Sequence, residues 1–170
     1  MAVIEAIQTT YLEADAASVE FSGIPATYEH LQLRWSARSD SGATYDNSYF
    51  RFNSDTASNY SHHYMSGYGS TASAGGTATQ NTIFAYRLSG ASSAAESYGT
   101  AVLDILDYAN TAKNTTISGT GGLDGDLSEV IFYSGLWDST AAVHTIWLKP
   151  YNGSNFPRGS EFTLYGLNSA

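Results

Sequence analysis

The chain of 170 residues contains no cysteine, which excludes disulfide bonds, thiolate metal sites and cysteine nucleophiles. It is also poor in charge, because only 14% of its residues are charged, compared with about a quarter in a typical globular domain. Its 16 acidic residues outnumber its 7 basic ones, for a net charge of −9, and the basic residues are scattered singly. Since nucleic acids and anionic membranes are bound by basic patches, we expect neither as a partner.

Long hydrophobic runs are missing as well. No apolar run approaches the roughly 20 residues that a membrane-spanning helix needs. The N-terminal segment carries Glu5 and lacks the positive charges of a signal peptide, so we expect the protein to fold where it is made. The length is typical of one domain, and we predict a single domain over residues 1–170.

The dominant pattern in the sequence is a series of short segments in which apolar and polar residues alternate. In residues 29–37, Leu31, Leu33 and Trp35 alternate with polar neighbours, which is the period of a half-buried β-strand. Clusters of Gly, Asn, Asp, Ser and Pro, which favour turns, separate these segments. The predicted strands lie within residues 3–12, 18–23, 29–37, 48–53, 59–66, 82–89, 100–107, 113–118, 129–134, 144–150 and 161–167.

This spacing predicts an all-β fold: a jelly-roll-like, two-sheet β-sandwich of about 8–11 short antiparallel strands with long loops. For residues 98–110, which also allow a helix, we prefer a strand because apolar residues alternate there. In residues 82–89 we expect Phe84, Tyr86 and Leu88 to face away from Ile83 and Arg87. Residues 66–82 are small and polar, and we predict a long loop.

The adjacent residues His62 and His63 raise the question of a metal site. Neighbouring residues on a strand point to opposite faces, so the two imidazoles cannot easily bind one ion. His30 and His144, the other histidines, lie in separate segments. We therefore predict no metal here and expect the two faces of this strand to differ in burial. These faces are Tyr60, His62 and Tyr64 on one side and Ser61, His63 and Met65 on the other.

A glycine-rich segment brings Asp124, Asp126, Ser128 and Glu129 together. Oxygen ligands in such a loop can hold calcium, but the spacing of a known calcium loop is missing, so we interpret the segment as an acidic hairpin turn. Whether calcium or a glycan is bound stays open at this point.

Other patterns of catalysis are weak. Asp104 and Asp107 are a possible pair of carboxylates for glycoside hydrolysis, but residues three apart on a strand lie on opposite faces. The sequence contains neither a G-x-S-x-G nucleophile motif nor a phosphate-binding loop. We therefore predict that the protein is not an enzyme and has no catalytic residues, metal or cofactor; a metal-dependent or acidic hydrolase is the weakest alternative.

Four segments together resemble a known group of proteins. They are SVEFSGIPATYEHLQLRW, YFRFNSDTASNYSHHYMSGYGS, AVLDILDYANTAKNTTI and the terminal FTLYGL. Their order is similar to that in virion structural proteins of tailed bacteriophages, including phages of cyanobacteria. Related sequences look like jelly-roll capsid decoration, or cement, proteins. The resemblance covers most of residues 17–167 and carries over no functional residues.

The resemblance implies a virion protein on the capsid exterior, assembled in the host cytoplasm. Such a protein binds the lattice of the major capsid protein, stabilises the head and often forms a homotrimer. The alternative is a receptor- or glycan-binding module of a tail or head fibre. We expect residues 1–16, as a strand or arm, and residues 66–82 to make contacts between subunits or with the capsid. The candidate contact residues are Ile4, Ile7, Tyr11, Tyr60, His62, Tyr64 and Tyr68.

Overall fold

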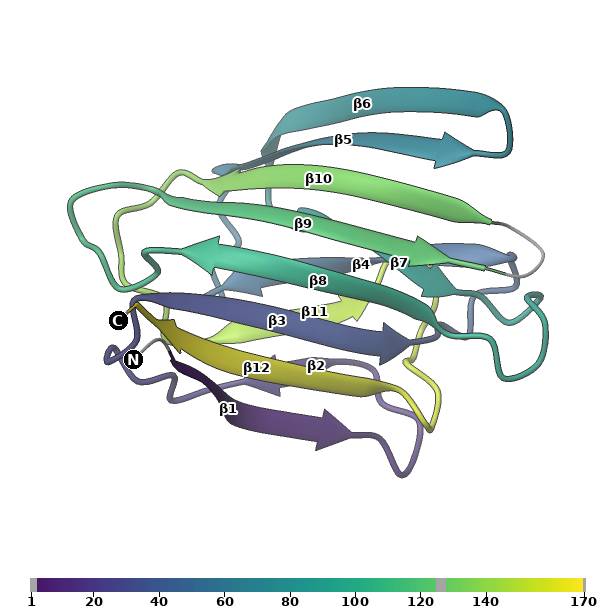
Figure 1. The fold of residues 1–170 in the computed structure, drawn as a ribbon, viewed down its shortest axis with the longest axis horizontal. Helices are drawn as coiled ribbons and strands as arrows, with labels where there is room; N and C mark the ends of the chain where they lie inside the picture. Colours follow the sequence, from purple (N-terminus) through teal and green to yellow (C-terminus); the bar gives the residue numbers. More distant parts are fainter. Residues whose placement is uncertain (1–2, 125–127, 170) are drawn as a thin grey trace.

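A computed structural model describes residues 3–124 and 128–169 and shows two antiparallel sheets packed face to face (Figure 1). The described residues contain no helix, and so none that could cross a membrane. The predicted all-β sandwich is confirmed. Its strands are β1 (Val3–Tyr11), β2 (Val19–Phe21), β3 (His30–Ala37), β4 (Tyr45–Phe52), β5 (Tyr60–Tyr68), β6 (Thr71–Gln80), β7 (Ile83–Ser89), β8 (Gly99–Leu106), β9 (Thr115–Leu123), β10 (Glu129–Trp137), β11 (Ile146–Pro150) and β12 (Glu161–Asn168).

The two sheets differ in width. The large sheet has eight strands in the order β1-β12-β3-β8-β9-β10-β5-β6, and the small sheet has four in the order β2-β11-β4-β7. In Figure 1 the small sheet lies behind the middle of the large one, and β5 and β6 extend above it. The large sheet therefore ends in two free edges, β1 and β6, and the β5–β6 hairpin overhangs the small sheet.

The core forms where the two sheets overlap, and strand alternation supplies its side chains. Leu31, Leu33 and Trp35 of β3 are buried, as are Phe50 and Phe52 of β4 in the opposite sheet. Residues 98–110 supply strand β8 and not a helix, which confirms the preferred interpretation. These inward residues leave the large sheet's outer face to solvent.

The prediction of a long loop over residues 66–82 is wrong. These residues form the end of β5 and all of β6, joined by a tight turn in which Gly69 has a φ of 54°. Such a turn favours glycine because a positive φ costs other residues energy. No residue of β6 is buried, so the strand needs no apolar face and shows no alternation in its sequence.

The expectation for residues 82–89 is also wrong in part. Ile83 and Arg87 are buried, as are Tyr86 and Leu88. The register between β4 and β7 shifts here, because Asp46 pairs with Leu88 and Asn47 with Tyr86. Arg87 has no partner residue in this pairing, so its side chain does not follow the in–out alternation that the sequence predicts.

Strand β5 confirms the predicted difference between the faces of the two histidines. His62 is 4% exposed, and its ring lies 4.9 Å from that of Phe84, while His63 is exposed on the other face. The His62 Nδ1 atom has no hydrogen-bond partner among the described residues. Burial, with a smaller contribution from His63, lowers the pKa of His62 to about 4.

A buried ion pair joins the sheets where the small one ends. Arg87 of β7 donates two hydrogen bonds to the Glu129 carboxylate of β10, from Nε to Oε2 at 2.7 Å and from Nη2 to Oε1 at 3.0 Å. Arg87 Nη1 donates a third to Asn47 Oδ1. The guanidinium lies over the rings of Tyr45 and Tyr86, at 4.6 and 5.1 Å from their centres. The pair thus closes the end of the core next to the overhang.

The buried histidine makes stability depend on pH. Between pH 6.5 and 4 the unfolded chain binds a proton at His62 that the folded chain rejects, so stability is full above pH 6.5 and falls as the pH drops. His62→Phe should reduce the loss of unfolding free energy between pH 7 and 4 by about 3 kcal/mol. Urea unfolding measures it, with the exposed His63→Gln as control. An unchanged pH dependence in His62→Phe would contradict this.

Removing one partner of the buried ion pair should be costly. We expect Glu129→Gln to lower the unfolding free energy by about 3 kcal/mol, because Arg87 keeps its charge at a buried position without the opposite charge of the carboxylate. The double variant Arg87→Met/Glu129→Leu should recover most of that loss. Urea unfolding with the exposed Glu161→Gln as control measures both effects. A loss in Glu129→Gln no larger than that in Glu161→Gln would show that the pair is not structurally important.

Candidate functional site

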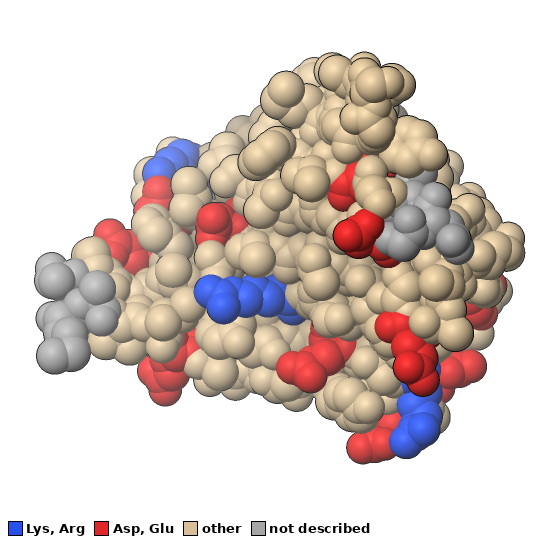
Figure 2. All heavy atoms as spheres, turned by 45° about the vertical axis from the view of Figure 1, so that its right-hand side comes forward, with Lys and Arg blue, Asp and Glu red and all other residues tan. Residues whose placement is uncertain are grey.

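The β5–β6 hairpin is exposed and uncharged. Between Asp55 and Arg87 the sequence contains no Asp, Glu, Lys or Arg, although the protein carries a net charge of −9. Figure 2 shows this difference: the top of the molecule, where Figure 1 places β5 and β6, is tan, and the acidic residues lie below it. A second molecule can therefore approach this region without meeting the repulsion of the acidic surface.

An apolar cluster continues from the hairpin onto the outer face of the large sheet. Met65, Val130 and Phe132 are each more than half exposed. Met65 of β5 is directly paired with Phe132 of β10. Val130 precedes Phe132 by two residues in β10 and so lies on the same face of the sheet. A hollow of about 360 Å³ lies over this pair of strands. Exposed apolar residues that touch one another in this way indicate a binding surface. We call Met65, Val130 and Phe132 the outer apolar cluster.

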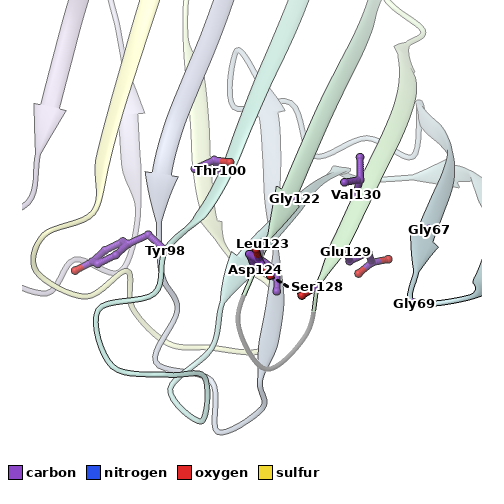
Figure 3. A pocket seen from close by; sticks show the side chains of 10 residues that line it. All are labelled: Gly67, Gly69, Tyr98, Thr100, Gly122, Leu123, Asp124, Ser128, Glu129 and Val130. Atoms are coloured by element: carbon purple, nitrogen blue, oxygen red, sulfur yellow. Dashed lines mark hydrogen bonds between the residues drawn. The ribbon is translucent and has the colours of Figure 1, made fainter.

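A second hollow, of about 590 Å³, lies beside this cluster at the ends of β8, β9, β10 and β5 (Figure 3). Small residues on the outer face, Thr100, Gly122 and Gly67, leave the space open next to Val130. Figure 3 shows Glu129 and Val130 leaving β10 in different directions. Asp124, Ser128 and Glu129 also line this hollow, so its surface is only partly apolar.

The geometry adds nothing to the calcium hypothesis. Ser128 Oγ donates a hydrogen bond to the Asp124 carboxylate, and Asp126 lies outside the described residues. Glu129 is bound to Arg87. Across residues 3–124 and 128–169, no three His, Asp or Glu side chains come together as metal ligands.

Asp104 and Asp107 have separate hydrogen-bond partners. Gln32 Nε2 donates to Asp104 Oδ1 at 2.7 Å, while Asp107 pairs with Lys113 beyond the end of β8, and its backbone N–H donates to His30 Nδ1 at 3.0 Å. The hydrogen bond from Lys113 lowers the pKa of Asp107, which keeps this carboxylate ionised. Such a pair does not have the arrangement of a general acid facing a nucleophile.

The predicted contact residues divide into two groups. Ile4 and Tyr11 are exposed on β1, and Ile7 is half-buried there. Tyr68 is exposed and Tyr64 half-buried near the end of β5. These five therefore lie on the two outermost parts of the large sheet, far apart along its width.

The other two predicted contact residues, Tyr60 and His62, are core residues. Tyr60 is 1% exposed, and its hydroxyl bonds the backbone of Phe52 and Asp55. His62 packs against Phe84. Their burial is at odds with the predicted contact, because a side chain enclosed between two sheets cannot reach a partner. The sequence shows that one face of β5 is buried but does not show which.

The two free edges of the large sheet share one property: every residue of β1 and of β6 is exposed or half-buried. Exposed edge strands offer unpaired backbone groups to another strand. Proteins that avoid such pairing place charge or proline at the edge, and β6 has neither. The segments 1–16 and 66–82, predicted to make contacts, thus contain the two free edges.

No family model and no curated protein sequence matches this chain. Among solved structures, the galectin LEC-6 of Caenorhabditis elegans is similar over 95% of this chain and 96% of that chain, with a TM-score of 0.33 and 9% sequence identity. This likeness concerns the fold alone.

Proposed function

We propose that this protein is a structural protein of a tailed-phage particle that decorates the capsid and acts by binding rather than by catalysis. One observation carries the proposal: in an acidic protein, an exposed surface without Asp, Glu, Lys or Arg runs from the β5–β6 hairpin to the outer apolar cluster. Such a surface suits permanent contact with other protein subunits. The resemblance of the sequence to phage decoration proteins supports the same function.

The contacts divide between the face and the edges of the large sheet. The outer apolar cluster would pack on the major capsid protein, where burial of Met65, Val130 and Phe132 supplies hydrophobic free energy. Strand β1 of one copy would pair with β6 of the next. Because these edges differ, their contact is head-to-tail, which forms a ring when the rotation between copies closes, and the resemblance favours a ring of three. Many copies on one lattice make modest single contacts sufficient.

Purified protein should bind capsids that lack it and raise the temperature at which those capsids break. Phe132→Glu should abolish binding, because it places a charge in the centre of an apolar contact. The matched control is Tyr151→Glu, at an exposed aromatic residue just after β11 of the small sheet. Co-sedimentation and thermal breakage of the capsids measure the two effects. If the unmodified protein stays unbound and capsid heat resistance is unchanged, the proposed function is wrong.

Light scattering should give a mass three times that of the 18.2 kDa chain. Ala74→Lys should convert this species to monomers, because a lysine on an edge strand opposes edge-to-edge pairing. Thr116→Lys, an equally exposed change on the interior strand β9, should leave the mass unchanged. A monomeric unmodified protein, or a trimer that survives Ala74→Lys, would contradict pairing through β6.

A further inference from the structure

A hollow of about 350 Å³ lies beneath the overhanging hairpin. One wall is the inner face of β5 and β6, and the other is formed by the start of β4 and the end of β7. This volume falls within the range of small-molecule sites. Its walls hold tyrosines and hydroxyl-bearing residues: Tyr45, Tyr64, Tyr68, Ser66, Thr71 and Ser73.

The buried pair of Arg87 and Glu129 also lines this hollow. A guanidinium has five N–H donors, and Glu129 and Asn47 take three of them in the described part of the chain. Each carboxylate oxygen likewise accepts more than one hydrogen bond. The pair therefore places fixed donors and acceptors side by side, and its own bonds hold both groups in position before a ligand arrives.

Two tyrosines offer exposed aromatic surface at the same place. Tyr45 is 40% exposed and Tyr68 is 48% exposed. The contact of Tyr45 with the Arg87 guanidinium fixes its ring at 4.6 Å from that cation. Tyrosine gives a rigid contact at low entropic cost, with an apolar body and a polar tip. A flat ring of this kind suits a ligand with one apolar face and a polar rim.

The charge of the hollow limits the ligand further. Arg87 and Glu129 compensate each other, and the remaining lining residues carry no formal charge at neutral pH. The protein as a whole has a net charge of −9. A phosphate or an acidic sugar would meet no uncompensated cation here and would be repelled by the rest of the surface.

We propose that the hollow beneath the β5–β6 hairpin binds an uncharged carbohydrate. The apolar face of a sugar ring would lie on Tyr45 or Tyr68, and its hydroxyl groups would bond the Arg87–Glu129 pair and the serine and threonine hydroxyls. This site is separate from the outer apolar cluster, which lies on the opposite face of the large sheet. The protein can therefore bind a sugar while its outer face contacts other subunits.

A glycan array that carries neutral and anionic oligosaccharides tests this proposal with the full-length protein. We expect binding to at least one neutral glycan, and Tyr45→Ala and Tyr68→Ala should each weaken it about tenfold. Tyr151→Ala, at a tyrosine as exposed as Tyr45 that follows β11 of the small sheet and does not line the hollow, should bind as the unmodified protein does. Binding to no neutral glycan, binding to anionic glycans alone, or full binding by both hollow variants would overturn the proposal.

A second variant separates loss of the site from loss of the fold. Ser73→Trp enlarges an exposed side chain of β6 and fills the hollow without touching the ion pair. It should abolish glycan binding and leave the thermal unfolding temperature unchanged. If Ser73→Trp instead leaves glycan binding intact, the hollow is not the site. If it breaks subunit contacts in a protein that binds no neutral glycan, the hollow is a polypeptide contact and the proposal is wrong.

Discussion

The large sheet has twice as many strands as the small one, and the other features of the fold follow from this difference. Eight strands face four, so the large sheet continues past β7 without a covering layer. A strand beyond that point cannot bury an apolar face, and β6 accordingly consists of small, uncharged residues, none of them buried. The Arg87–Glu129 pair lies at this boundary and joins the last covered part of the large sheet to the end of the small one. The overhang, its free edge and the hollow beneath it follow from this arrangement.

The core contacts and the proposed contacts with other subunits consequently lie in different parts of the structure. Close approach of the sheets at β9 depends on glycine: a Cβ at Gly121 would lie 2.3 Å from the Tyr86 carbonyl oxygen, and one at Gly119 would meet the ring of Tyr133. Trp137 packs against Phe52 in the same core. None of these residues belongs to the outer apolar cluster or to the free edges. Substitutions on the binding surfaces therefore test function without removing the contacts that hold the sandwich together.

Alternation predicts a strand when one of its faces is buried, as for β3 and β4, and so the sequence predicts the sandwich. The same reasoning misses β6, since a strand exposed on both faces shows no alternation. It also places Arg87 on the wrong face of β7, because the sequence of one strand does not reveal a shift in its pairing with the next strand. The hollow escapes prediction for another reason: Tyr45, Tyr68 and Glu129 meet only through the long-range pairing of four strands. The burial of Tyr60 and His62 shows a further limit: the alternation in a strand predicts that it has two different faces but not which of them is buried.

We propose that this protein acts by contact, with the outer apolar cluster against the capsid, the edge strands against neighbouring copies and space for a neutral ligand beneath the overhang. In this proposal the large sheet faces other subunits of a virus particle. A three-dimensional image reconstruction of the virion that contains this protein tests it. We expect the sandwich on the outside of the capsid shell, with Met65, Val130 and Phe132 against the shell and β6 against a neighbouring copy. A position on the tail, or absence from the particle, would contradict it.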